Sequence, residues 1–214
     1  MKPLWSLLSA LALCLGLSLA AQAAEFSADI VRTMDGKPTL GGAGKTYVKD
    51  DKIRMETTAE GHRQVMITNP AAGKAYMLMP STLSYIEMPL DPSRMGPEAL
   101  KEGREDLGQW RTVGRETVDG WDCEKRVFEF KDKSKGEMTA WFADKLGHPI
   151  KSIVKEGSTT MTMEYKNIKT GPVDPALFSV PAGYQRLAIP GMGPGMGQGM
   201  GQGMPGGKGP KPGM

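Results

Sequence analysis

The chain has 214 residues, of which 39% are hydrophobic and 24% charged, with a formal net charge of +3 and a pI near 8.8. Its charges alternate in sign and no basic block precedes the C-terminal tail, so we expect no nucleic-acid partner. The small positive excess favours an anionic membrane surface only weakly.

The N-terminus has the three parts of a secretory signal peptide. Lys2 supplies a positive charge, residues 4–21 are almost wholly apolar, and Ala21-Gln22-Ala23 forms a small-x-small cleavage site. The apolar run falls short of the roughly 20 residues that a spanning helix needs, which argues against an uncleaved anchor. We therefore expect residues 1–23 to be removed, leaving a periplasmic or secreted protein.

The two cysteines leave a second interpretation of the signal open. In a lipoprotein, the acylated cysteine follows a small residue, whereas Leu13 precedes Cys14, so we interpret Cys14 as an apolar residue of the signal. Cys123 is then the only cysteine, and no intramolecular disulfide can form. It either pairs between chains or is buried, and burial is the commoner outcome.

Residues 24–187 are predicted to form one domain of short strands separated by turn residues, the pattern of an antiparallel meander. Glycines at 36, 41 and 42 are expected to break the chain after the first strand, and Asp119-Gly120 is a hairpin signal. One sheet face should be apolar and the other polar. The predicted strands are 26–30, 45–49, 52–58, 63–68, 75–79, 83–88, 112–118, 121–131, 137–143, 150–155 and 159–168.

A helix is predicted over residues 97–107. Pro97 suits the first helical position and Glu98 the positive end of the helix dipole, and Leu100 and Leu107 share a face. The predicted fold class is therefore mainly β (α+β), a large twisted antiparallel sheet whose inner face the helix covers. Periodicity alone does not distinguish an open barrel from a sandwich.

The C-terminal residues 188–214 are rich in glycine, methionine and proline. Such a segment buries too little apolar surface to offset its ordering entropy, so we predict a disordered tail. Four methionines recur every fourth residue, at 192, 196, 200 and 204. Thioethers select Cu(I), which makes copper handling one alternative; a flexible, non-binding extension is the simpler one.

Motifs spread over the whole core resemble those of a known family. They include Phe26-Ser27-Ala28-Asp29, the run from Lys52 to Glu56, the run from Val118 to Lys125, and the closing run from Asp174 to Tyr184. In these the chain resembles periplasmic proteins of unknown function grouped with LolA-type lipoprotein carriers. The resemblance implies a curved antiparallel half-barrel with helices over its concave face, where the carriers hold acyl chains. The carriers place an arginine and a proline before the strand that begins at Lys52, whereas this chain has Asp50-Asp51, so that arginine's lid-holding role does not transfer.

Residues able to support catalysis are few. His62 and His148 lie at predicted turns without metal-ligand spacing, and neither forms a known nucleophile signature with Cys123. Gly44-Lys45-Thr46 looks like the end of a phosphate-binding loop, but Thr39 stands where that loop needs its first glycine. We therefore expect no enzyme activity, cofactor or metal site in the core.

Methionines within the predicted strands are the strongest functional signal. Methionine adapts to irregular apolar volumes, so a hollow lined with it can accept acyl chains of different lengths, although methionine also fills ordinary cores. The leading hypothesis is a non-enzymatic binding protein for a lipid or acyl chain; the alternative is a structural protein with a filled core that contacts an envelope protein or membrane surface. The candidate ligand-binding residues are Met55, Met77, Met79, Met161 and Met163.

Overall fold

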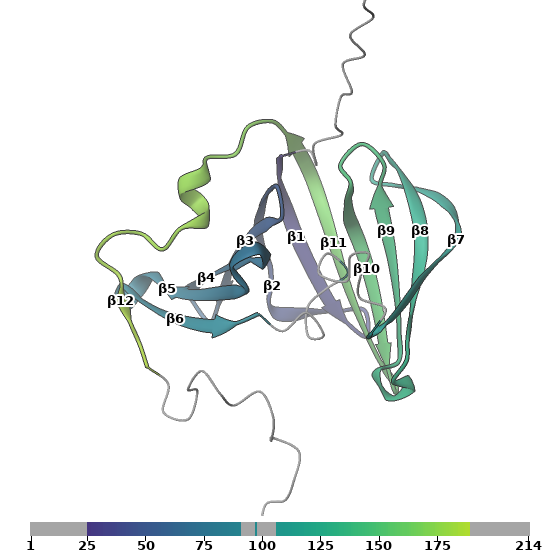
Figure 1. Cartoon of the computed structure of the whole chain (residues 1–214), viewed down its shortest axis with the longest axis horizontal. Coiled ribbons are helices and arrows are strands. Elements are labelled where there is room, and N and C mark those ends of the chain that lie inside the picture. The colour runs from purple at the N-terminus through teal and green to yellow at the C-terminus, as the bar shows by residue number, and fades with distance from the viewer. Residues whose placement is uncertain (1–24, 91–96, 98–105, 189–214) are drawn as a thin grey trace, which may run out of the picture.

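The computed structural model describes residues 25–90, 97 and 106–188, and the strands of this part form one twelve-stranded sheet (Figure 1). The predicted signal peptide, nearly all of the predicted helix and all but the first residue of the predicted tail lie outside the described residues. The strands are β1 (Phe26–Met34), β2 (Lys37–Lys49), β3 (Lys52–Ala59), β4 (His62–Asn69), β5 (Lys74–Met79), β6 (Ser84–Pro89), β7 (Gly108–Val118), β8 (Trp121–Phe130), β9 (Glu137–Ala143), β10 (His148–Glu156), β11 (Thr159–Thr170) and β12 (Gln185–Arg186).

The sheet consists of two meanders joined at its centre. Strands β1 to β6 follow one another on one side and β7 to β11 on the other, and the first strand pairs antiparallel with the eleventh (Figure 1). The short β12 pairs in parallel with β6 at one edge. The predicted large antiparallel sheet is thus confirmed, and it is open and curved. Among the described residues, no helix is long and apolar enough to cross a bilayer.

Tight turns set the register of the meanders. Asp35-Gly36, Glu60-Gly61 and Asp119-Gly120 each have positive φ at both positions, between 50° and 81°. Paired positive φ values define the turn that matches the twist of two adjacent strands, and glycine adopts them without strain. The hairpin predicted at Asp119-Gly120 is confirmed.

Strand β2 begins earlier than predicted. Gly36 lies in the turn that ends β1, as predicted, but Gly41 and Gly42 were also expected to interrupt the chain, and β2 runs through both without a break from Lys37 to Lys49. Gly41 takes a φ of 64° inside the strand, and the pairing of β1 with β2 shifts register between Val31 and Thr33. A local irregularity absorbs the extra residues, so the glycines bend the strand instead of ending it.

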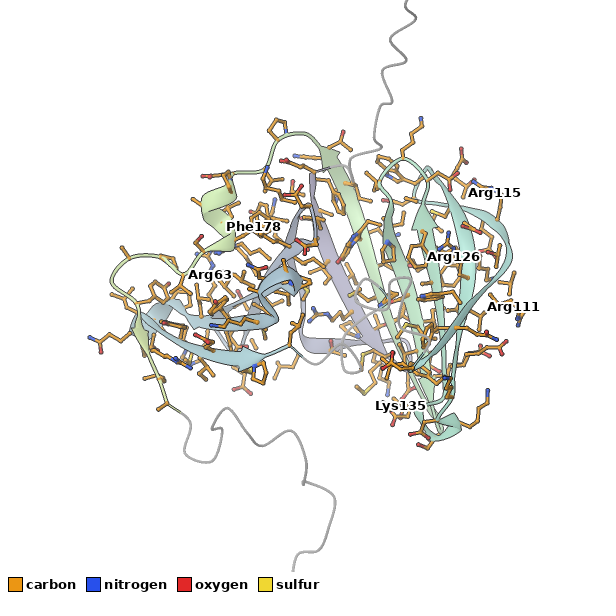
Figure 2. The ribbon with its side chains drawn as sticks, in the orientation of Figure 1. Arg63, Arg111, Arg115, Arg126, Lys135 and Phe178 are labelled. Carbon is orange, nitrogen blue, oxygen red and sulfur yellow. The ribbon has the colours of Figure 1, made fainter. Side chains whose placement is uncertain are left out.

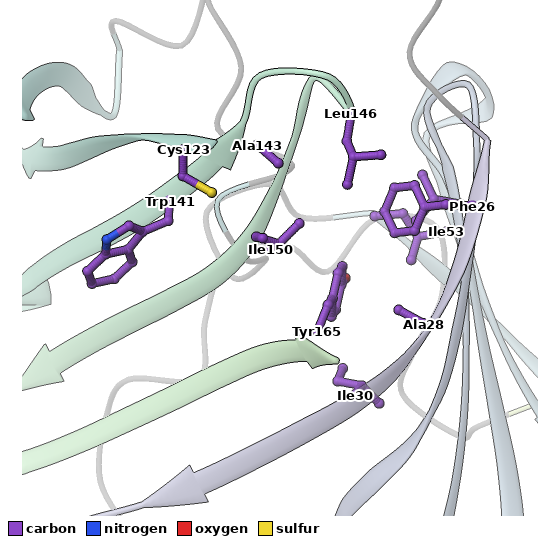
Figure 3. Packing of buried hydrophobic residues seen from close by; sticks show 11 residues of the cluster. Phe26, Ala28, Ile30, Ile53, Cys123, Trp141, Ala143, Leu146, Ile150 and Tyr165 are labelled. Atoms are coloured by element: carbon purple, nitrogen blue, oxygen red, sulfur yellow. The ribbon is translucent and has the colours of Figure 1, made fainter. Parts of the chain in front are cut away.

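A core cluster joins the two meanders where β1 meets β11 (Figure 3). Phe26, Ile30 and Tyr165 are fully buried, and the rings of Phe26 and Tyr165 lie 6.2 Å apart. Ile150 and Leu146 complete this contact from β10 and the turn before it. Because the cluster draws on both ends of the sequence, it fixes the two halves of the sheet relative to one another.

The prediction that one sheet face is polar is wrong for part of the sheet. Over β4 and β5 this face carries the buried side chains of Val65, Ile67 and Leu78, which pack against Val173 and Phe178 of the C-terminal segment. Phe178 is labelled in Figure 2. That segment includes the 3-10 helix η6 (Pro175–Phe178), and Asp174 caps it by accepting from the backbone N–H of Ala176 at 2.9 Å. Both faces of the sheet are therefore apolar over the centre of β4 and β5.

Candidate functional site: a methionine face

A row of methionines crosses three neighbouring strands. Met55 of β3 lies directly opposite Met66 of β4, and Met66 lies opposite Met77 of β5. Directly opposed residues point to the same face of a sheet, so these side chains are neighbours. Met79 follows two residues after Met77 on that strand and shares the face. All four side chains are partly buried.

A second methionine group lies on the two central strands. Met163 and Met161 of β11 pair with Arg32 and Met34 of β1. Met161 and Met34 remain 43% and 42% exposed, which makes this pair the accessible part of the group.

A contact between Arg32 and Met55 shows that both groups share one face. The guanidinium Nη2 of Arg32 donates to Sδ of Met55 over 2.9 Å, across the intervening strand β2. Gly44 of β2 pairs with Ile30 on one side and Thr57 on the other, so it puts no side chain in the way. We call this surface the methionine face; it carries Met34, Met55, Met66, Met77, Met79, Met161 and Met163. The structure thus places all five methionines predicted from the sequence on one face of the sheet, spread from β11 to β5.

The methionine face continues toward β7 as an aromatic cluster. Met161 pairs with Val154 of β10, which pairs with Met138 of β9, which pairs in turn with Phe128 of β8. Phe128 is almost fully buried, and its ring lies 5.0 Å from that of Trp110. This end of the face is filled by side chains, whereas the centre of the face retains exposed methionine.

The opposite face carries a different arrangement around Trp141. Its indole Nε1 donates to Oε2 of Glu116 over 2.8 Å, and the ammonium groups of Lys125 and Lys151 lie 5.0 Å and 5.2 Å from the ring centroid. Hydrogen bonds from Lys125 and Trp141 hold the pKa of Glu116 below its usual range. This is a cation–π and ion-pair cluster that covers an aromatic ring.

The groups considered for catalysis lie on three different strands: Cys123 on β8, His148 on β10 and His62 on β4. Cys123 is buried, as predicted, and its Sγ donates to the carbonyl oxygen of Trp121 over 3.3 Å. Burial raises the pKa of the Cys123 thiol, so it is protonated at neutral pH. The His148 ring stacks on Tyr165 with centroids 5.9 Å apart, while His62 is exposed at the start of β4. Among the described residues, no three His, Cys, Asp or Glu side chains gather where they could hold a metal.

The phosphate-loop-like residues lie within strand β2. Thr46 is buried and donates to the carbonyl oxygen of Arg54, and Lys45 lies 4.0 Å from the carboxylate of Asp29. A pocket of about 310 Å³ lies beside this pair, lined by Ser27, Ala28, Asp29, Lys45, Asn167 and Lys169. None of the five predicted methionines lines it.

The family of the chain follows from a sequence match. A model of the DUF4412 family, described as a domain of unknown function, matches residues 32–147 and 130–184. The chain belongs to the DUF4412 family. The prediction that it belongs to a family of unknown function is thereby confirmed. Among curated proteins, none matches the sequence significantly.

Solved structures similar to this DUF4412 domain are distant in sequence. An uncharacterized conserved protein from Thermus thermophilus superposes with a TM-score of 0.53 at 11% identity, covering 78% of this chain and 91% of that chain. MucB in its Pseudomonas aeruginosa complex with MucA gives 0.46 at 15% identity, covering 73% and 56%. The lipoprotein LppX from Mycobacterium tuberculosis gives 0.40 at 17% identity, covering 73% and 93%. The likeness to the Thermus protein is one of fold.

Proposed function

We propose that this protein is a non-enzymatic binding protein that acts outside the cytoplasm and holds an apolar or lipid-like ligand on its methionine face. The observation that carries the proposal is the continuous row of Met55, Met66 and Met77, with partly exposed Met161 on the same face of the sheet. Unbranched thioether side chains repack around ligands of different shape, so such a surface suits a flexible chain. The signal-like N-terminus and the resemblance to lipoprotein carriers support the location and the ligand class.

The proposal predicts that affinity depends on ligand length. Each further methylene removed from water contributes about 0.8 kcal/mol at best, which corresponds to roughly fourfold in affinity. The test is displacement of the neutral dye N-phenyl-1-naphthylamine by a series of linear alkanols. Affinity should rise with chain length until the site is full. Absent binding, or binding independent of chain length, would contradict the proposal.

Two similarly exposed residues on opposite faces provide a matched control. Met161 lies on the methionine face at 43% exposure, and Val31 lies on the other face at 38%. Met161→Gln should weaken alkanol binding by about 1 kcal/mol, roughly fivefold, because an amide then faces an apolar ligand. Val31→Gln should leave binding unchanged. Equal effects of the two substitutions would show that the ligand does not lie on the methionine face.

The aromatic cluster supports a second candidate function. Phe128, Phe130 and Met138 fill one end of the methionine face, as expected for a structural protein with a packed sheet that contacts an envelope protein or the membrane surface. Well-folded protein that binds no member of the alkanol series would favour this candidate. Copper handling by the methionines of the tail concerns residues outside the described part of the chain and stays a prediction.

A further inference from the structure

One charged side chain stands within the methionine face. Along β1 the residues that point to this face are Phe26, Ala28, Ile30, Arg32 and Met34, so an arginine interrupts an otherwise apolar series. Its neighbours across the sheet are Met163 on β11 and, beyond β2, Met55. Arg32 is partly buried.

The guanidinium of Arg32 donates to a weak hydrogen-bond acceptor, although it could bind a carboxylate. A guanidinium carries five N–H donors in a planar fork that matches a carboxylate with two parallel hydrogen bonds. Its side chain instead donates to the thioether of Met55, a weak acceptor, and no carboxylate among the described residues pairs with it. Two other cations of the sheet do have such partners: buried Arg54 binds Glu56 at 2.7 Å, and partly buried Lys151 binds Glu164 at 2.8 Å.

From this contrast, and resting on the proposed function, we infer that the ligand of the methionine face is a long-chain fatty acid whose carboxylate binds Arg32. The carboxylate would displace Met55 Sδ from the guanidinium, and the alkyl chain would then lie along Met55, Met66 and Met77. From β1 to β5 there are four inter-strand steps, about 19 Å at the usual strand spacing, so a long chain is needed to cover the row. A buried carboxylate is tolerated only when it is paired, and Arg32 supplies the charge complement.

The test compares two ligands of equal length on the full chain as recovered from cells. Hexadecanoate and hexadecanol displace the same neutral dye, and they differ only in the head group. Hydrogen bonds to charged groups are strong enough that hexadecanoate should bind about tenfold or more tightly than hexadecanol. In Arg32→Gln this preference should disappear, because hexadecanoate loses much more affinity than hexadecanol, and in Arg32→Lys part of the preference should remain.

Arg111→Gln is the matched control, because it removes the same charge from an exposed arginine of β7 (Figure 2). It should leave the preference for hexadecanoate intact. Equal binding of the two ligands by the unmodified chain would overturn the inference, and so would an equal loss of both in Arg32→Gln. Tighter binding of hexadecyl phosphate than of hexadecanoate would overturn the assignment to a fatty acid. If neither hexadecanol nor hexadecanoate binds, the proposed function itself fails; if both bind equally, only the inference about Arg32 fails.

Discussion

Arg54 donates a hydrogen bond from Nη1 to the backbone carbonyl oxygen of Leu177, 2.9 Å away and 123 residues further along the chain. The guanidinium is buried at 8% residue exposure, and its Nε also binds Glu56 at 2.7 Å. This one side chain therefore ties strand β3 to the C-terminal segment that covers the sheet.

Replacing Arg54 by methionine should destabilise the fold. The carbonyl oxygen of Leu177 would lose its donor, and leaving a buried polar group without a partner costs about 1–3 kcal/mol. Urea unfolding followed by tryptophan fluorescence measures the change. Arg111→Met is the control: Arg111 forms an exposed ion pair with Glu129, so its loss should cost at most about 1 kcal/mol. Equal effects would show that the Arg54 contact does not hold the segment.

Phe178→Ala should release the C-terminal segment from the sheet. Phe178 is 6% exposed and packs in the cluster that includes Val65, Ile67 and Leu78. Truncation of a buried phenylalanine costs about 3–5 kcal/mol. Limited proteolysis should then cleave the region of residues 171–184 much faster than in the unmodified chain. Leu40→Ala, at a residue 73% exposed, should change neither stability nor cleavage.

Acid sensitivity should depend in part on Glu25. Hydrogen bonds from Lys49 and from the backbone N–H of Val173 hold the pKa of Glu25 below its usual range. A carboxyl whose folded-state pKa is depressed contributes stability that is complete above the unfolded pKa of about 4.3 and is lost as pH falls through the folded value. Glu25→Gln should therefore lower the thermal midpoint at neutral pH, and the two proteins should converge in acid.

Glu156→Gln provides the control for this pH series. Glu156 is exposed at the end of β10 and forms no ion pair with any described residue. Its thermal midpoint should follow that of the unmodified chain at every pH. A constant offset between Glu25→Gln and the unmodified chain, from neutral pH into acid, would show that the Glu25 carboxylate is not the titrating group.

The thiol of Cys123 should be unreactive in the folded protein. It is 1% exposed, and burial raises its pKa, so both access and thiolate formation are disfavoured. Ellman's reagent should detect no thiol under native conditions and one per chain in denaturant. Two thiols per denatured chain would show that Cys14 is retained and that the predicted removal of residues 1–23 is wrong. Rapid reaction of the native protein would contradict the buried placement.

Much of the fold could be predicted because its determinants are local. Short strand-forming runs bounded by turn residues identified every strand except the two-residue β12, and Glu137–Ala143 has the same limits in the prediction and in the structure. Asp119-Gly120 specified its hairpin because only a few residue pairs adopt two positive φ values without strain. Alternation also placed Met161 and Met163 on one face, since the side-chain period of a strand is two.

Two further patterns in the sequence indicate the covered second face and the charge on the methionine face. Val65-Met66-Ile67 and the run from Tyr76 to Met79 are apolar without alternation, which indicates strands covered on both faces. The structure supplies that second cover through residues 173–184. Arg32 likewise interrupts the series of Phe26, Ala28 and Ile30, an alternation that marks it as a charge on an apolar face.

By itself, the sequence determined the strands, their tight turns and which side chains share a face along each strand, because these depend on residues a few positions apart. Only the tertiary structure decided which strands far apart in the sequence are neighbours. The pairing of β1 with β11 and the contact of Arg32 with Met55 across β2 depend on register between distant segments. The register is set by the apolar surface that all strands of the sheet bury together, and residues a few positions apart in the sequence do not determine that total.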